Sequence, residues 1–162
     1  MTGHSRTIAR PLPGRATAVL LAILTVAIGA RTMAGQDAPA SQKMTVRDGV
    51  YSKAQAERGR AAFTTTCAKC HSLVAGEKTG YKDEGPALAG DPFLTKWDGR
   101  TVFDLVSNIR LNMPPDGSVF LEPDDTADLI AYLLQVNKFP DGDRTLKGDA
   151  SARDITMAKS SR

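Results

Sequence analysis

The segment TTTCAKCHSL, residues 64–73, holds both cysteines of this 162-residue chain and one of its two histidines. Cys67, Cys70 and His71 fall within five consecutive positions. Thiols and imidazoles bind metals, form disulfides and react with prosthetic groups, so their clustering predicts a shared chemical site. Any fold that this chain adopts must keep the three side chains together.

Four kinds of site use such residues. In a thioredoxin-like redox pair, C-x-x-C opens a helix that follows a strand, whereas here it follows a helical pattern and no strand pattern is evident. A structural zinc site needs four ligands, and two cysteines with one histidine leave it incomplete. A disulfide explains the cysteines but not the histidine. The pattern C-x-x-C-H favours covalent haem attachment, with a thioether from each thiol and His71 as a ligand of the iron.

The second axial ligand decides whether such a haem carries electrons or performs chemistry. The only other histidine, His4, lies in an N-terminal segment that we expect to be removed, so methionine is the next candidate. Met113 lies 42 residues after His71 and is followed by two prolines that make the segment rigid. The other methionines fall in that N-terminal segment, in a linker or in a tail: Met1, Met33, Met44 and Met157.

The N-terminal segment has the pattern of a secretory signal peptide. Residues 1–15 carry three arginines and no acid, and residues 16–30 are apolar apart from two threonines. This apolar run is shorter than the roughly 20 residues that span a bilayer, and an uncleaved membrane anchor is the alternative. We expect export to the periplasm and cleavage after Ala34, with Ala30 and Ala40 as other possible sites.

The positive charge of the chain belongs to this segment. Residues 1–34 contain four arginines and no acid, so their removal takes the formal charge from +3 to −1. A nucleic-acid-binding domain is typically basic, and the mature chain has no such excess of charge. Nucleic acid is therefore excluded as an expected partner.

Composition divides the chain into four parts. Residues 1–34 form the signal peptide, and the polar residues 35–50 form a flexible linker. Residues 51–140 contain the motifs and the helical patterns and make one domain. Residues 141–162 are polar without clear periodicity, and we expect a surface tail.

The domain is expected to be all-α, with three main helices and long loops. A capping box of Ser52 and Gln55 begins a first helix that runs into the cysteine motif. Apolar periodicity predicts further helices over residues 101–110 and 122–137, whereas residues 72–100 look like a loop. A protein core this small is marginal on its own, so a large flat prosthetic group would complete it.

Five motifs, in this order and spacing, resemble those of the class I c-type cytochromes: CAKCH, GPALAG, the tryptophan at position 97, NMPPDG and DLIAYLL. The resemblance covers about residues 51–140. It implies a cytochrome c fold around one haem c, attached through Cys67 and Cys70 and ligated by His71 and Met113. It also implies two further cofactor-binding residues. The carbonyl of Pro86 would accept a hydrogen bond from His71, and Trp97 would bond a haem propionate.

The same resemblance implies how the helices pack. The first and last helices would cross at Gly59, with Phe63 and Tyr132 in contact. Apolar residues near the motifs are candidate walls of the haem crevice: Leu88, Leu105, Ile109, Leu111 and Phe120.

Residues 113–143 also resemble the end of small periplasmic cytochromes that accompany pyrroloquinoline-quinone-dependent dehydrogenases. Lys138 and Asp141 stand where those proteins typically have glycine and alanine. The resemblance implies a single-electron carrier without a small-molecule substrate. Its partners would be redox proteins, with a periplasmic dehydrogenase, such as a quinoprotein, as donor and an oxidase or another cytochrome as acceptor. The alternatives are a haem subunit of a larger oxidoreductase, or a haem enzyme or sensor with a displaceable sixth ligand.

Overall fold

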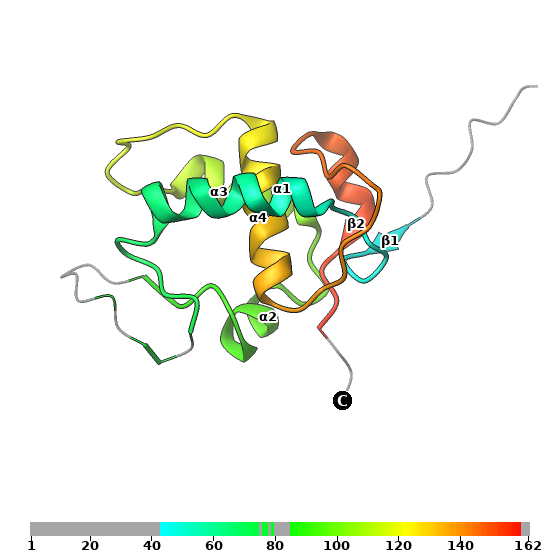
Figure 1. Cartoon of the computed structure of the whole chain (residues 1–162), viewed down its shortest axis with the longest axis horizontal. Coiled ribbons are helices and arrows are strands. Elements are labelled where there is room, and N and C mark those ends of the chain that lie inside the picture. The colour runs from blue at the N-terminus through cyan, green and yellow to red at the C-terminus, as the bar shows by residue number, and fades with distance from the viewer. Residues whose placement is uncertain (1–42, 75, 78, 80–84, 160–162) are drawn as a thin grey trace, which may run out of the picture. The chain divides into compact units, whose positions relative to one another are not determined.

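The computed structural model describes residues 43–74, 76–77, 79 and 85–159 (Figure 1). The predicted signal peptide, residues 1–34, and residues 35–42 of the predicted linker lie outside this part. The described residues form an all-α fold in which α1, α3 and α4 correspond to the three predicted helices.

Helix α1, Lys53–Ala62, begins where the capping box predicts. The Ser52 hydroxyl accepts a hydrogen bond from the Gln55 amide, and the Gln55 side chain accepts one from the Ser52 amide, both at 3.4 Å. These bonds satisfy two N–H groups that the first turn of a helix leaves free. The helix continues directly into a π-helical turn, η1, over Phe63–Cys67.

Helices α3, Val102–Asn112, and α4, Pro123–Val136, confirm the other two predictions. Thr101 and Asp104 form a second capping box at the start of α3. The N-cap residue of α4 is Glu122, which makes no side-chain capping bond within the described part of the chain. Other residues stabilise this helix end instead. The proline in the first turn has its φ fixed near the helical value, and the negative charges of the two aspartates after it interact favourably with the helix N-terminus.

A fourth helix, α2, spans Asp91–Trp97 within the region that the sequence predicts as a loop. The helix has only seven residues, of which Phe93 and Trp97 are buried. Two apolar positions are too few to establish a helical period, and Pro92 reads as a helix breaker unless it is placed in the first turn. The loop prediction for residues 91–97 is therefore wrong.

Helix α1 crosses α4 at Gly59, as the resemblance implies (Figure 1). A Cβ atom on Gly59 would collide with the backbone carbonyl of Asp128, so only glycine permits this approach. Near the same crossing, the rings of Phe63 and Tyr132 lie 5.6 Å apart at an interplanar angle of 51°. Offset aromatic pairs of this kind add to the stability of a helix contact.

The ends of the described chain pair with each other. Strand β1, Met44–Thr45, runs parallel to β2, Ile155–Thr156, and Figure 1 shows the two side by side. Val46, directly after β1, is fully buried and its amide donates to the Thr156 carbonyl at 3.0 Å. The second half of the predicted flexible linker is thus an ordered part of the fold.

The predicted surface tail is also part of the core. A 3₁₀ turn, η2, covers Ala150–Asp154. The buried apolar side chains of the C-terminal segment are Leu146, Ala152, Ile155 and Met157. The buried Gln55 side chain donates to the Leu146 carbonyl at 2.9 Å and accepts from the Leu146 amide at 2.8 Å. Sequence periodicity misses the segment because its apolar residues are irregularly spaced among polar ones.

Among the described residues, no helix has the length and apolarity required to cross a membrane.

Truncation of Leu146 tests the role of the C-terminal segment in the core. Leu146 is 1% exposed, so Leu146→Ala should lower the free energy of unfolding by about 2–5 kcal/mol, because it leaves a cavity in packed surroundings. The neighbouring Lys147 is half exposed, and Lys147→Ala should change stability by less than about 0.5 kcal/mol. Chemical denaturation of both variants measures these changes in stability. Equal denaturation midpoints for Leu146→Ala and Lys147→Ala would show that the segment is a surface tail.

Candidate functional site

One cavity brings together all six residues that the sequence predicts for the site. Its empty space, including the part open to solvent, is about 1090 Å³. The predicted residues among those that line it are Cys67, Cys70, His71, Pro86, Trp97 and Met113.

The π-helical turn η1 delivers the cysteines to this cavity. The Ala68 amide bonds to the Phe63 carbonyl at 3.0 Å, five residues back, which is the wider π-type spacing. The chain then tightens, because the amides of Cys70 and His71 both bond to the Cys67 carbonyl, at 3.1 and 2.9 Å. This turn places the histidine on the same side of the chain as the two thiols.

Two threonines before the motif account for the wider turn. The Thr64 hydroxyl donates to the Arg60 carbonyl at 2.9 Å, and the Thr65 hydroxyl lies 3.1 Å from the carbonyls of Ala61 and Ala62. Threonine hydroxyls that bond back to helix carbonyls compete with the regular ladder and bend helices. Widened turns of this kind are frequent at functional sites.

Neither Cys67 nor Cys70 forms a disulfide in the described structure. Burial, with a smaller effect of the Cys70 thiol, raises the pKa of the Cys67 thiol to about 11. The attacking cysteine of a redox-active C-x-x-C pair has a lowered pKa, since the thiolate is the reactive form. The environment of Cys67 therefore disfavours the thioredoxin-like interpretation.

His71 is oriented by the backbone of Pro86. Its Nδ1 atom lies 2.7 Å from the Pro86 carbonyl oxygen, the hydrogen bond that the resemblance implies. Because a carbonyl can only accept, Nδ1 carries the proton in this bond, and in the neutral imidazole this leaves the lone pair on Nε2. A second-shell bond of this kind fixes the ring and raises the basicity of the free nitrogen, as in many metal-ligating histidines.

Gly85 forms a cradle for the His71 ring, and the sequence analysis did not predict this contact. A Cβ atom there would collide with His71 Cε1 and lie only 2.6 Å from Nδ1. The ring therefore packs directly against the glycine backbone. The motif GPAL contains the signal for this contact, because a glycine beside the acceptor proline marks a close approach.

Backbone bonds hold the loop of Gly85 and Pro86 beside the cysteine motif. The Gly85 amide donates to the Cys70 carbonyl at 2.7 Å, and the Leu88 amide donates to the Ser72 carbonyl at 2.8 Å. The two bonds flank Pro86 on either side. The acceptor carbonyl is thus fixed relative to the segment that carries His71.

Met113 lines the cavity at the point where α3 ends. Its backbone is extended, with φ −127° and ψ 136°, and its amide still bonds to the Ile109 carbonyl at 2.9 Å. The proline that follows disfavours the helical conformation at Met113, so the chain must leave the helix there. Pro114 and Pro115 line the same cavity.

Trp97 reaches the cavity from the unpredicted helix α2. It is 3% exposed, and its ring lies 6.5 Å from that of Phe93. The side chains of Lys96 and Arg100 both lie over the indole, with the charged groups 5.4 Å from the ring centroid. Cation–π contacts of this kind hold positive charge next to the tryptophan. Its bond to a propionate remains a prediction.

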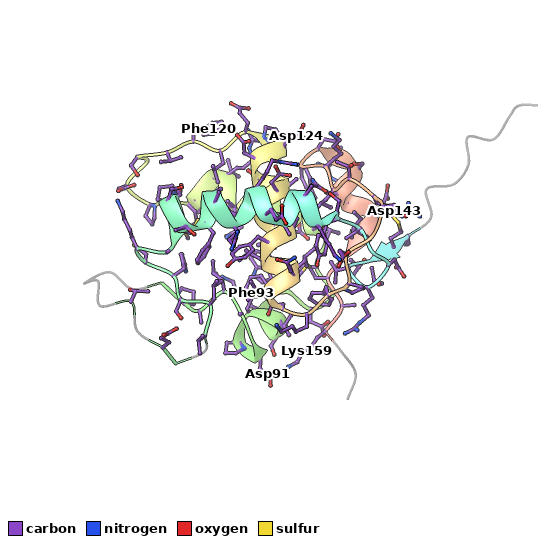
Figure 2. All side chains as sticks on the ribbon, in the orientation of Figure 1. Asp91, Phe93, Phe120, Asp124, Asp143 and Lys159 are labelled. Atoms are coloured by element: carbon purple, nitrogen blue, oxygen red, sulfur yellow. The ribbon has the colours of Figure 1, made fainter. Side chains whose placement is uncertain are left out.

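The predicted walls are correct for Leu88, Leu105 and Ile109, which line the cavity, and wrong for two residues. Leu111 is 80% and Phe120 66% exposed, and both line a separate depression outside the site. Figure 2 shows Phe120 at the edge of the molecule and Phe93 near its middle. The wall residues missed from the sequence are Phe93, Leu121, Leu129 and Leu133. Helical phase explains the error for Leu111, because this residue follows Ile109 by two positions and faces away from it. Phe120 lies in the loop between α3 and α4, where helical phase does not apply.

The sequence is similar to those of known proteins. Residues 54–133 match a family described as cytochrome c oxidase, cbb3-type, subunit III. Cytochrome c of Chlamydomonas reinhardtii is 31% identical over 99 residues, which cover 48% of this chain and 86% of the relative. Cytochrome c of Gossypium barbadense is 31% identical over 101 residues, covering 49% of this chain and 88% of the relative. The chain belongs to the cytochrome c family. No solved structure matches it.

The site of this cytochrome fits haem c, the covalently bound cofactor of the family. Cys67 and Cys70 have the spacing for the two thioethers, and both line the cavity. The walls are largely apolar, and His71 is held with one nitrogen free by Gly85 and Pro86. The chain is accordingly a monohaem electron-transfer cytochrome that works with redox partner proteins.

Adding one methyl group tests the cradle under His71. In Gly85→Ala the ring must move, which should lower the free energy of unfolding of the haem-loaded protein by about 1–3 kcal/mol, as overpacking does. The displaced ring should also show shifted proton resonances. Gly99→Ala is the matched control, because a Cβ atom on Gly99 has no neighbour within 4 Å, although its φ of +74° adds backbone strain. Wild-type His71 resonances in Gly85→Ala would rule out the contact.

Proposed function

We propose that this cytochrome carries single electrons through a haem iron ligated by His71 and Met113. One observation carries the proposal. One largely apolar cavity contains the two cysteines, a histidine whose Nδ1 atom donates to the Pro86 carbonyl, and the only methionine among the cavity-lining residues. An iron with both axial positions filled has no site for a substrate, which leaves electron transfer as its chemistry.

Haem c supplies an iron that accepts and releases one electron between Fe(III) and Fe(II). The residues of this chain set its potential. The Met113 thioether, a soft ligand, prefers Fe(II), and the apolar walls disfavour the additional positive charge of Fe(III). The Pro86 bond acts in the opposite direction, because it makes His71 a stronger donor. We expect the first two effects to dominate and the potential to be positive.

We infer that the protein works in the periplasm. The pattern of residues 1–34 supports export. Its donor would be a periplasmic dehydrogenase, such as a quinoprotein, and its acceptor would be an oxidase or another cytochrome. Lys138 supports the resemblance behind this choice. Its φ is +67°, the left-handed conformation that favours the glycine typical of those cytochromes at this position.

A second candidate is a haem subunit of a larger oxidoreductase. The match of residues 54–133 to a family named for an oxidase subunit favours it. The two candidates differ in assembly rather than in chemistry. Stable co-purification of the cytochrome with a catalytic subunit would support the second, and recovery as a separate protein would support a shuttle.

Replacing Met113 tests its role as ligand. Met113→Leu conserves volume, so the fold should lose less than about 1.5 kcal/mol. The open axial position should then bind carbon monoxide in the ferrous form. The potential should fall by on the order of 100 mV, part of the roughly 0.8 V over which axial ligands set haem potentials.

Met157→Leu is the matched control. Met157 is buried in the core, 2% exposed, and does not line the cavity, so this variant should keep the wild-type potential and exclude carbon monoxide. Spectroelectrochemical titration and carbon monoxide difference spectra measure both properties. An unchanged potential in Met113→Leu would remove Met113 from the iron.

A further inference from the structure

The side chain of Asn137 joins the end of α4 to the loop that carries Pro86. Its Nδ2 group donates to the Leu133 carbonyl at 2.8 Å and to the Leu88 carbonyl at 3.0 Å. Its Oδ1 atom accepts from the Gly90 amide at 2.9 Å. All three contacts are to backbone groups.

The bond to Leu133 has a local explanation at the helix end. Asn137 is the C-cap residue of α4, and the Leu133 carbonyl accepts from its side chain and, at 3.1 Å, also from its backbone amide. The bonds to Leu88 and Gly90 have no such explanation, because they leave the helix. They satisfy backbone groups 47 and 49 residues away in sequence, at the entrance to α2. Figure 1 shows this end of α4 beside α2.

The loop so anchored is the one that orients His71. Pro86, which accepts the His71 proton, is two residues before Leu88, whose amide is bonded to Ser72. Leu88 therefore has its amide tied to the cysteine segment and its carbonyl tied to α4. With Gly85 bonded to Cys70, the acceptor carbonyl is held from three directions.

We propose that Asn137 is a positioning residue for the axial histidine: by anchoring Leu88 and Gly90 to α4, it keeps the Pro86 carbonyl at hydrogen-bond distance from His71. Since that bond makes His71 a stronger electron donor, Asn137 lowers the potential of the iron without touching the haem. This inference rests on the proposed function, in which His71 ligates the iron.

Two variants of the haem-loaded protein test it. Asn137→Ala removes all three bonds. Asn137→Asp keeps the size and the acceptor for Gly90 but loses both donors, and it remains available if the alanine variant does not fold. Thr126→Val is the control for lost stability. Thr126 is fully buried on α4, its hydroxyl bonds to the Glu122 carbonyl, and it lies 11 residues, about 16 Å of helix, from Asn137.

The first measurement is the exchange of the His71 Nδ1 proton with solvent, followed by NMR in the ferrous state. In the Asn137 variants it should accelerate about tenfold relative to the amide of Val106 in α3, as expected for the loss of one hydrogen bond. Thr126→Val should change the two rates together, because it acts only through global stability. The second measurement is the potential, which should become more positive in the Asn137 variants alone.

If the proton exchange and the potential change in Asn137→Ala but not in Asn137→Asp, the bond to Gly90, which the aspartate retains, is sufficient for positioning. If both Asn137 variants match Thr126→Val in proton exchange and potential, Asn137 is only a helix cap and the inference is wrong. Failure of the proposed function looks different. In that case the wild-type protein itself would lack a His71-ligated, low-spin spectrum.

Discussion

The hydrogen bond between His71 and Pro86 is the interaction on which the rest of the site depends. It fixes the imidazole ring and leaves the lone pair on Nε2, the nitrogen that a metal can use. Everything around it maintains this geometry. Gly85 leaves room for the ring, the Cys70 and Ser72 carbonyls hold the loop on one side, and Asn137 holds it on the other. A small protein thus uses backbone contacts to place one side chain.

The arrangement of helices follows from the need to surround a large flat cofactor. Helices α2, α3 and α4 each contribute walls of the cavity, and the chain between α1 and α2 supplies the cysteines and Pro86. The α1–α4 crossing at Gly59 is the most extensive helix contact among the described residues. The C-terminal segment packs against the first turn of α1, where the Gln55 side chain bonds to the backbone of Leu146. These contacts compensate for the small protein core of the domain.

Sequence reasoning worked where a residue type has few physical uses. Few alternatives exist for two thiols next to a histidine, for a methionine before two prolines, or for a glycine at a helix crossing. The structure brings the thiols, the histidine and the methionine to one cavity. Sequence reasoning failed where the type of a residue does not indicate its place in the fold. Helix α2 is too short to show a period, and the apolar residues of the C-terminal segment are irregularly spaced. Leu111 looks like Ile109 until the helical phase is known, and Phe120 lies between α3 and α4, where no period indicates its direction. Asn137 was missed because its partners are backbone groups distant in sequence.

The central claim is that His71 and Met113 fill both axial positions of a haem c iron. The measurement that tests it most directly is the absorption spectrum of the wild-type protein, oxidised and reduced, with and without carbon monoxide. The account predicts a c-type reduced spectrum, a weak far-red band from methionine to ferric iron, and no response of the ferrous form to carbon monoxide. Rapid carbon monoxide binding, or a missing far-red band, would contradict it and point to a haem enzyme or sensor with an open sixth position.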